Sequence, residues 1–164
     1  MRPHDLAVTP QGTNEVLISR SFHAPRALVW RAMTDPALLP KWMKGPPGWE
    51  MHLCQNDLRV GGAYRWGWRD NTDQTIFIFG VNKAVNAPEE NTRTETMEGT
   101  CAPPNACEVL ATMRLKERSP GTTHMTITVL CPSTDVRDAM LNSGMEHGLI
   151  PSYETLDTML AAGL

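Results

Sequence analysis

The sequence lacks most of the features that assign a chain to a specialised class. Its 15 basic residues do not outnumber its 18 acidic ones, and the net charge of −3 argues against a surface for nucleic acid or anionic lipid. No apolar run approaches the ~20 residues of a membrane span. Residues 1–14 lack the apolar core of a signal peptide, which favours a cytoplasmic protein. Repeats are absent, and 164 residues fit one domain.

The cysteines do not form a metal-binding pattern. Cys54, Cys101, Cys107 and Cys131 include no Cys-x-x-Cys pair. His52 and Cys54 share one face of a predicted strand, but a metal needs two further ligands, which the sequence does not supply. We therefore expect no metal and four free thiols. A bridge between Cys101 and Cys107 across "CAPPNAC" is the sterically conceivable alternative.

Signatures of catalysis are also missing. The chain has no Gly-x-Ser-x-Gly elbow. Ser143 and His147 are four residues apart, with Glu146 beside them, and in a helix these two would face each other. Glu146 would point about a quarter-turn away from His147, and no oxyanion donor is evident. We assign no catalytic residue and expect no cofactor.

Alternating apolar and polar residues are present in abundance and predict strands. The clearest case is "AYRWGWRD", which places Tyr64, Trp66 and Trp68 on one face. The pattern predicts seven strands, at residues 15–22, 49–54, 63–70, 74–81, 92–99, 107–117 and 122–130.

Helical signals flank these strands. Pro25 begins a short helix, and Asp35 with Pro36 begins a second, which ends near Lys44 because "GPPG" cannot continue it. Residues 133–160 are predicted to form one long helix with a buried stripe and a kink at Pro151. This order predicts an α+β fold in which the long helix covers an antiparallel sheet.

Four segments in sequence order resemble a known family. They are "APRALVWRAMTDP", Trp-x-x-Gly-Pro-Pro-Gly at 42–48, "DLRVGG" at 57–62 and "SGMEHG" at 143–148. From about Glu15 to Leu160 the chain is similar to the activator-of-heat-shock-chaperone-ATPase-like proteins of the START and birch-pollen-allergen-like superfamily, also called SRPBCC. Met43 and Lys44 depart from the paired tryptophans usual in that family.

The resemblance implies a helix-grip fold. In that fold a curved antiparallel sheet of about seven strands wraps around a long C-terminal helix, and two short helices follow the first strand. We expect residues 1–13 to be a flexible leader and residues 14–164 to form the single domain.

In such a fold, a set of aromatic, methionine and glycine residues would line a central cavity. Aromatic rings with adaptable methionines suit a small hydrophobic or aromatic molecule, although the same residues would also fill a plain core. The predicted lining is Trp42, Trp49, Met51, Tyr64, Trp66, Trp68, Met113, Met125, Met140, Gly144, His147 and Gly148.

The leading hypothesis is therefore a ligand-binding protein that acts as a carrier, a sensor or a sequestering protein. The first alternative is an enzyme of the same superfamily, such as a polyketide cyclase or a hydrolase. The second is a co-chaperone-like module that stimulates a heat-shock chaperone ATPase. The expected partner is a small hydrophobic molecule, not nucleic acid or a membrane. A homodimer and a chaperone are the further partners considered.

Overall fold

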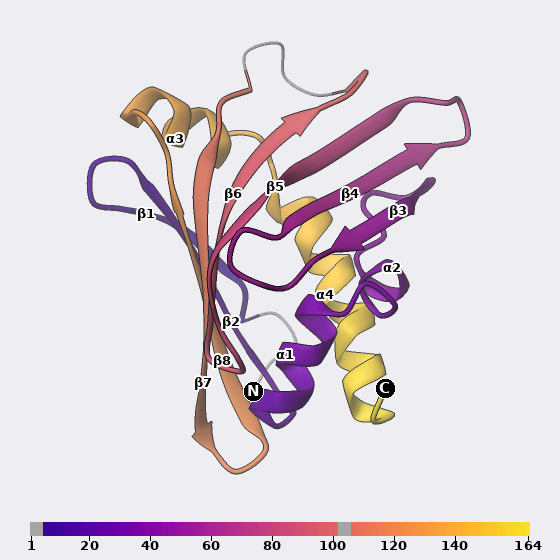
Figure 1. The fold of residues 1–164 in the computed structure, drawn as a ribbon, viewed down its shortest axis with the longest axis vertical. Coiled ribbons are helices and arrows are strands. Elements are labelled where there is room, and N and C mark those ends of the chain that lie inside the picture. The colour runs from indigo at the N-terminus through magenta and orange to yellow at the C-terminus, as the bar shows by residue number, and fades with distance from the viewer. Residues whose placement is uncertain (1–4, 102–105) are drawn as a thin grey trace.

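The computed structural model describes residues 5–101 and 106–164 as a curved antiparallel sheet that wraps around helices (Figure 1). The strands are β1 (Ala7–Gln11), β2 (Glu15–Phe22), β3 (Trp49–Asn56), β4 (Ala63–Asp70), β5 (Thr75–Asn86), β6 (Glu90–Glu98), β7 (Val109–Ser119) and β8 (Thr122–Leu130). The helices are α1 (Arg26–Thr34), α2 (Leu39–Trp42), α3 (Thr134–Leu141) and α4 (Glu146–Ala161). The strand order is β1-β2-β8-β7-β6-β5-β4-β3, so the sheet is open, with β1 and β3 at its edges.

The predicted α+β helix-grip class is confirmed. Strands β2, β4 and β8 have the bounds that the alternation predicts. In β2 every second side chain is buried, because it packs on the concave side while its neighbours face outward. None of the helices in the two described ranges has the length and apolar character that a membrane span requires.

The predicted strand count and the predicted leader need correction. Residues 7–11, assigned to a flexible leader, form β1, which pairs with β2 from Ala7 opposite Ser19 to Gln11 opposite Glu15. The sheet therefore has eight strands, and the two short helices follow its second strand. β1 is mostly exposed, so backbone pairing holds it in place and no apolar alternation reveals it in the sequence. Residues 1–4 of the predicted leader lie outside the described residues.

The prediction of one long C-terminal helix is wrong. α3 ends at Leu141 and α4 begins at Glu146, with a turn between them. Gly144 in that turn has φ of +74°, a left-handed conformation that an α-helix cannot contain. α4 continues through Pro151, and the kink expected there stays a prediction.

The second short helix is also shorter than expected. The Asp35 carboxylate accepts a hydrogen bond from the backbone N–H of Ala37 at 2.8 Å, which forms a turn. The four-residue α2 begins only at Leu39. α4 packs against α1 and α2, and together they cover the concave face.

The "DLRVGG" segment is a structural turn. Asn82, which is 1% exposed, donates from Nδ2 to the carbonyl oxygens of Asp57 at 2.9 Å and Gly62 at 3.2 Å. A Cβ on Gly62 would lie 2.0 Å from the Asp57 carbonyl oxygen, so only glycine fits there. Asn91 donates to the Asn82 side-chain oxygen at 3.1 Å and extends this buried network to β6.

Candidate functional site

Three aromatic side chains of β4 form a wall on the concave face. Tyr64, Trp66 and Trp68 are 2%, 4% and 8% exposed. The rings of Tyr64 and Trp66 are 5.0 Å apart between centroids, and those of Trp66 and Trp68 are 6.4 Å apart and edge-on. We call these three residues the aromatic wall. The period of two along β4 directs all three inward.

The indole N–H groups near this wall differ in their hydrogen bonding. Trp42 Nε1 donates to the Ala32 carbonyl at 3.0 Å, and Trp68 Nε1 donates to the Met43 carbonyl at 2.8 Å. Trp66 Nε1 is buried and has no partner among the described residues. A buried N–H without an acceptor costs about 1–3 kcal/mol, so this donor requires an explanation.

Arg93 of β6 reaches the same wall. Its guanidinium carbon lies 4.8 Å from the Trp66 ring centroid and 5.4 Å from that of Tyr64. Nη2 is 3.6 Å from a Glu95 carboxylate oxygen, and the two side chains are 13% and 24% exposed. Arg93 Nε is buried and, within the described part of the chain, has no hydrogen-bond partner. A second unpaired donor therefore lies beside Trp66.

The electrostatics of this region reflect its burial. Burial raises the pKa of Tyr64 above its ordinary value, and the Glu95 carboxylate raises it further, while Arg93 opposes the shift. The Tyr64 hydroxyl donates to the Thr94 carbonyl at 2.7 Å, which keeps it in its neutral form. The wall is thus apolar except for the Arg93–Glu95 pair and the Trp66 indole.

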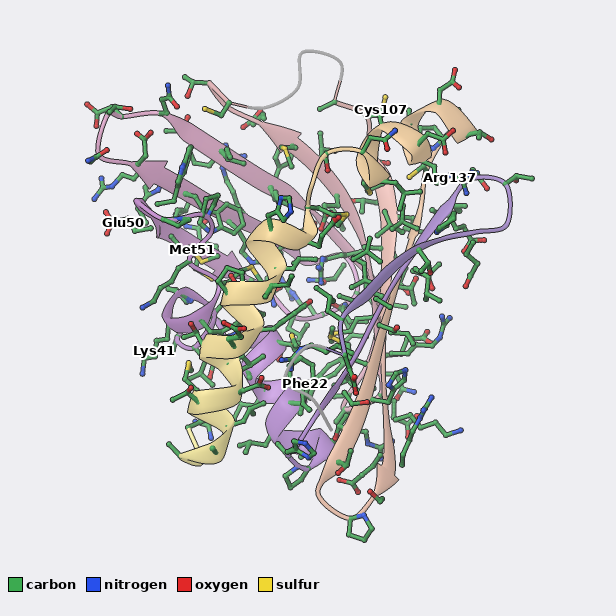
Figure 2. All side chains as sticks on the ribbon, turned by 180° about the vertical axis from the view of Figure 1, so that it is seen from behind. Phe22, Lys41, Glu50, Met51, Cys107 and Arg137 are labelled. Atoms are coloured by element: carbon green, nitrogen blue, oxygen red, sulfur yellow. The ribbon has the colours of Figure 1, made fainter. Side chains whose placement is uncertain are left out.

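The part of α4 from Ser152 onward packs against the interior (Figure 2). Tyr153 stacks on Trp42 at 5.8 Å and meets Phe22 edge-on at 5.6 Å. Arg20, 3% exposed, donates to both Asp157 oxygens, at 2.8 and 2.5 Å. Burial raises the pKa of Tyr153 to about 12, partly offset by Arg20 and Arg93. This end is closely packed.

The first turns of α4 pack more loosely. Gly148 lies one turn before the buried Ser152 and so is on the same helix face. A Cβ on Gly148 would meet no heavy atom within 4 Å, which indicates open space beside it. Leu149 is only half-buried, whereas Leu156 is 0% exposed. Glu146, the first residue of α4, has a buried carboxylate oxygen without a partner among the described residues.

The structure brings most of the predicted lining residues together, but not all of them. Those buried in the main core with the aromatic wall are Trp42, Tyr64, Trp66, Trp68, Met113 and Met125, with half-buried Trp49 and Met51 packed against them. Met140 lies on α3 and packs against a second cluster, which includes Val16 and Val129. Gly144 lies in the turn before α4, and His147 is exposed. Arg93 and Glu95 were missed, because "TRTETMEG" is polar on both faces apart from Met97, and one apolar residue does not establish which side is buried.

Ser143 Oγ donates to the Met140 carbonyl at 2.6 Å, and no hydrogen bond joins Ser143 to His147 in the described residues. Cys54, Cys101 and Cys131 carry free thiols in the described part of the chain. The described residues contain no group of three or more His, Cys, Asp or Glu side chains arranged to hold a metal.

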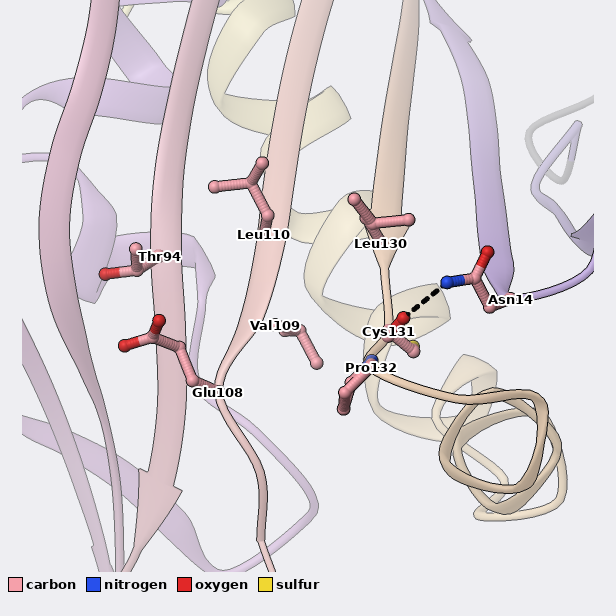
Figure 3. A pocket seen from close by; sticks show the side chains of 8 residues that line it. All are labelled: Asn14, Thr94, Glu108, Val109, Leu110, Leu130, Cys131 and Pro132. Atoms are coloured by element: carbon pink, nitrogen blue, oxygen red, sulfur yellow. Dashed lines mark hydrogen bonds between the residues drawn. The ribbon is translucent and has the colours of Figure 1, made fainter.

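A pocket of about 250 Å³ lies elsewhere, where β7 and β8 meet the segments beside them (Figure 3). Asn14 Nδ2 donates to the Cys131 carbonyl at its rim, at 2.7 Å. The residues that line it are Asn14, Thr94, Glu108, Val109, Leu110, Leu130, Cys131 and Pro132. None of them belongs to the aromatic wall or to the predicted lining.

Comparisons with known proteins agree with this fold. Residues 23–161 match the family model described as activator of Hsp90 ATPase homolog 1-like protein. A crystal structure from Rhodobacter sphaeroides has a TM-score of 0.85 at 29% identity, covering 95% of this chain and 98% of that one. Structures from Mycobacterium smegmatis and Nitrosomonas europaea have TM-scores of 0.78 and 0.77 at 22% and 23% identity, covering 96% and 94% of this chain and 100% and 98% of theirs. No curated protein matches the chain.

Proposed function

Because the chain belongs to the family of activator of Hsp90 ATPase homologue 1-like proteins, we propose that it binds a small hydrophobic or aromatic molecule between the concave face of its sheet and α4. The protein would then act as a carrier, a sensor or a sequestering protein. The single observation that carries the proposal is the unpaired, buried Trp66 Nε1 in an otherwise apolar aromatic wall. An apolar site with a few convergent polar groups is typical of small-molecule binding.

The loose packing of the first α4 turns supports the proposal. The open space beside Gly148 and the half-buried Leu149 lie on the helix face that carries the buried Ser152 and Tyr153. We place the ligand between these turns and the aromatic wall. In this proposal Met140 and His147 do not contact the ligand, because one belongs to the second cluster and the other is exposed.

Binding of a neutral fluorescent probe tests the proposal. N-phenyl-1-naphthylamine should bind saturably, with increased emission and energy transfer from the tryptophans. Gly148→Leu should fill the open space and weaken binding at least about tenfold, since a preformed apolar site loses affinity when its volume is taken. Ala161→Leu is the matched control, because Ala161 is exposed at the end of the same helix.

Two results would contradict the proposal. One is a folded protein that binds no probe at micromolar concentration. The other is equal binding by the two leucine variants, which would locate the probe elsewhere. Stimulation of a heat-shock chaperone ATPase by the same preparation, without probe binding, would favour the co-chaperone alternative.

A further inference from the structure

The two unpaired donors of the site lie close to each other. Arg93 carries its guanidinium carbon 4.8 Å from the Trp66 ring centroid, and Nε is bonded directly to that carbon. Trp66 Nε1 is part of the ring itself. Both N–H groups are buried and have no acceptor in the described residues.

Two N–H groups without acceptors favour a ligand group that accepts hydrogen bonds. An N–H group is satisfied by a carbonyl, ether or hydroxyl oxygen and not by another N–H. Neither donor has an acceptor within hydrogen-bond distance among the described residues, the Tyr64 hydroxyl oxygen included. The oxygen that completes the two donors therefore comes from outside the aromatic wall.

The charge of the site decides between a neutral oxygen and a carboxylate. Arg93 already has the Glu95 carboxylate 3.6 Å from Nη2, and both side chains are mostly buried. A carboxylate ligand would lose its hydration and would face the Glu95 carboxylate, which already pairs with Arg93. A neutral carbonyl or hydroxyl avoids both costs and still accepts from the two donors.

We infer that the site selects a neutral aromatic molecule bearing a carbonyl or hydroxyl oxygen, which accepts from Trp66 Nε1 and Arg93 Nε. The inference rests on the proposed function and narrows it from apolar molecules in general to this class. Plain hydrocarbons bind less tightly because they leave both donors unsatisfied. Aromatic acids bind less tightly because of Glu95.

Three naphthalenes of similar shape test this selection by calorimetry at pH 7: 2-acetylnaphthalene, 2-ethylnaphthalene and 2-naphthoate. The acetyl compound should bind at least about fivefold more tightly than the ethyl compound, the lower end of what satisfying a buried donor contributes. It should also bind more tightly than the naphthoate. In Trp66→Phe, which keeps an aromatic ring but removes the N–H, the preference for acetyl over ethyl should fall at least about threefold. Trp30→Phe makes the same change at a buried tryptophan of α1 instead of β4; it is the control and should leave the preference unchanged.

A spectroscopic readout follows the proposed hydrogen bond in the unaltered protein, and the variant serves only to assign the resonance. The chain has five tryptophans, and the Trp66 indole N–H resonance is the one missing in Trp66→Phe. The acetyl compound should move this resonance downfield, as a new hydrogen bond does, and the ethyl compound should not.

The outcomes separate the inference from the function on which it rests. Equal affinities of the two neutral probes would mean that water satisfies the donors, and would overturn the inference while ligand binding stands. Tightest binding of 2-naphthoate would overturn the preference for a neutral group. Failure of all three probes to bind would remove the proposed function, and the inference with it.

Discussion

Replacing Gly144 and Gly148 separately with alanine tests how the C-terminal region is divided. In a single long helix the two positions would be equivalent, and both changes would stabilise the protein by the difference in helix propensity. In the structure only Gly148 is helical, whereas Gly144 has φ of +74° in the turn before α4. The two substitutions should therefore have opposite signs.

The structure gives the size of each effect. At Gly148 the new methyl group meets no heavy atom within 4 Å, so Gly148→Ala should raise the free energy of unfolding by about 0.5–1 kcal/mol. At Gly144 the left-handed backbone costs an alanine about 1–2 kcal/mol. Its methyl would also lie 3.2 Å from Nδ1 of His147, an exposed ring that can shift. The variants should differ by about 1.5–3 kcal/mol, the span of these two terms.

Urea denaturation followed by circular dichroism measures this difference, with unchanged m-values as evidence that the unfolded state is the same. Equal stabilisation by both alanines would mean that the helix is continuous and that the turn does not exist in solution. A loss of stability in Gly148→Ala would mean that the space beside α4 is filled. Either result would refute the reasoning.

Three further predictions concern groups that hold or fill the interior. Asp157→Asn should lower the free energy of unfolding by about 2–3 kcal/mol, because it removes the carboxylate that pairs with the buried Arg20 guanidinium. The control Arg59→Ala breaks an exposed pair and should cost about 0.5 kcal/mol or less in the same urea titration. Tyr64→Phe should cost about 1–3 kcal/mol, because it removes the donor from a buried carbonyl; a cost below that in thermal denaturation would indicate that water replaces the hydroxyl. Burial raises the pKa of the Cys54 thiol from 9.0 to about 11. Between these two pH values the thiol is deprotonated in the unfolded chain but still protonated in the folded protein, so the free energy of unfolding should fall as pH rises. Cys54→Ala should show a shallower fall between pH 9 and pH 11, and an identical fall would contradict this assignment.

Much of the fold could be predicted because its strands alternate sharply. β4 is the best case, because its alternation places Tyr64, Trp66 and Trp68 on one face of the strand, and these large apolar side chains are buried on the concave side of the sheet. β1 could not be predicted in this way. Its position depends on backbone pairing with β2, and residues such as Thr9 and Gln11 carry no apolar signal.

The helix break and the polar part of the site were missed for a different reason. The apolar stripe of Tyr153, Leu156 and Leu160 extends back to Met145 in the sequence. The left-handed conformation of Gly144 does not interrupt this helical spacing, so the sequence does not reveal the break. The inward face of β6 was hidden because its threonines and its charged residues are all polar. The pairing of Arg93 with the buried Ala111 on β7 shows which side faces the core.

The uneven packing of α4 has a consequence for how such a protein can change over time. The folding energy of the helix is concentrated from Ser152 onward, at Tyr153, Leu156 and the Arg20–Asp157 pair. Positions 145–150 contribute less, because several of them are only half-buried. Substitutions there would alter the interior surface at little cost in stability. New ligand preferences could accumulate in those six positions while the rest of the chain preserves the fold.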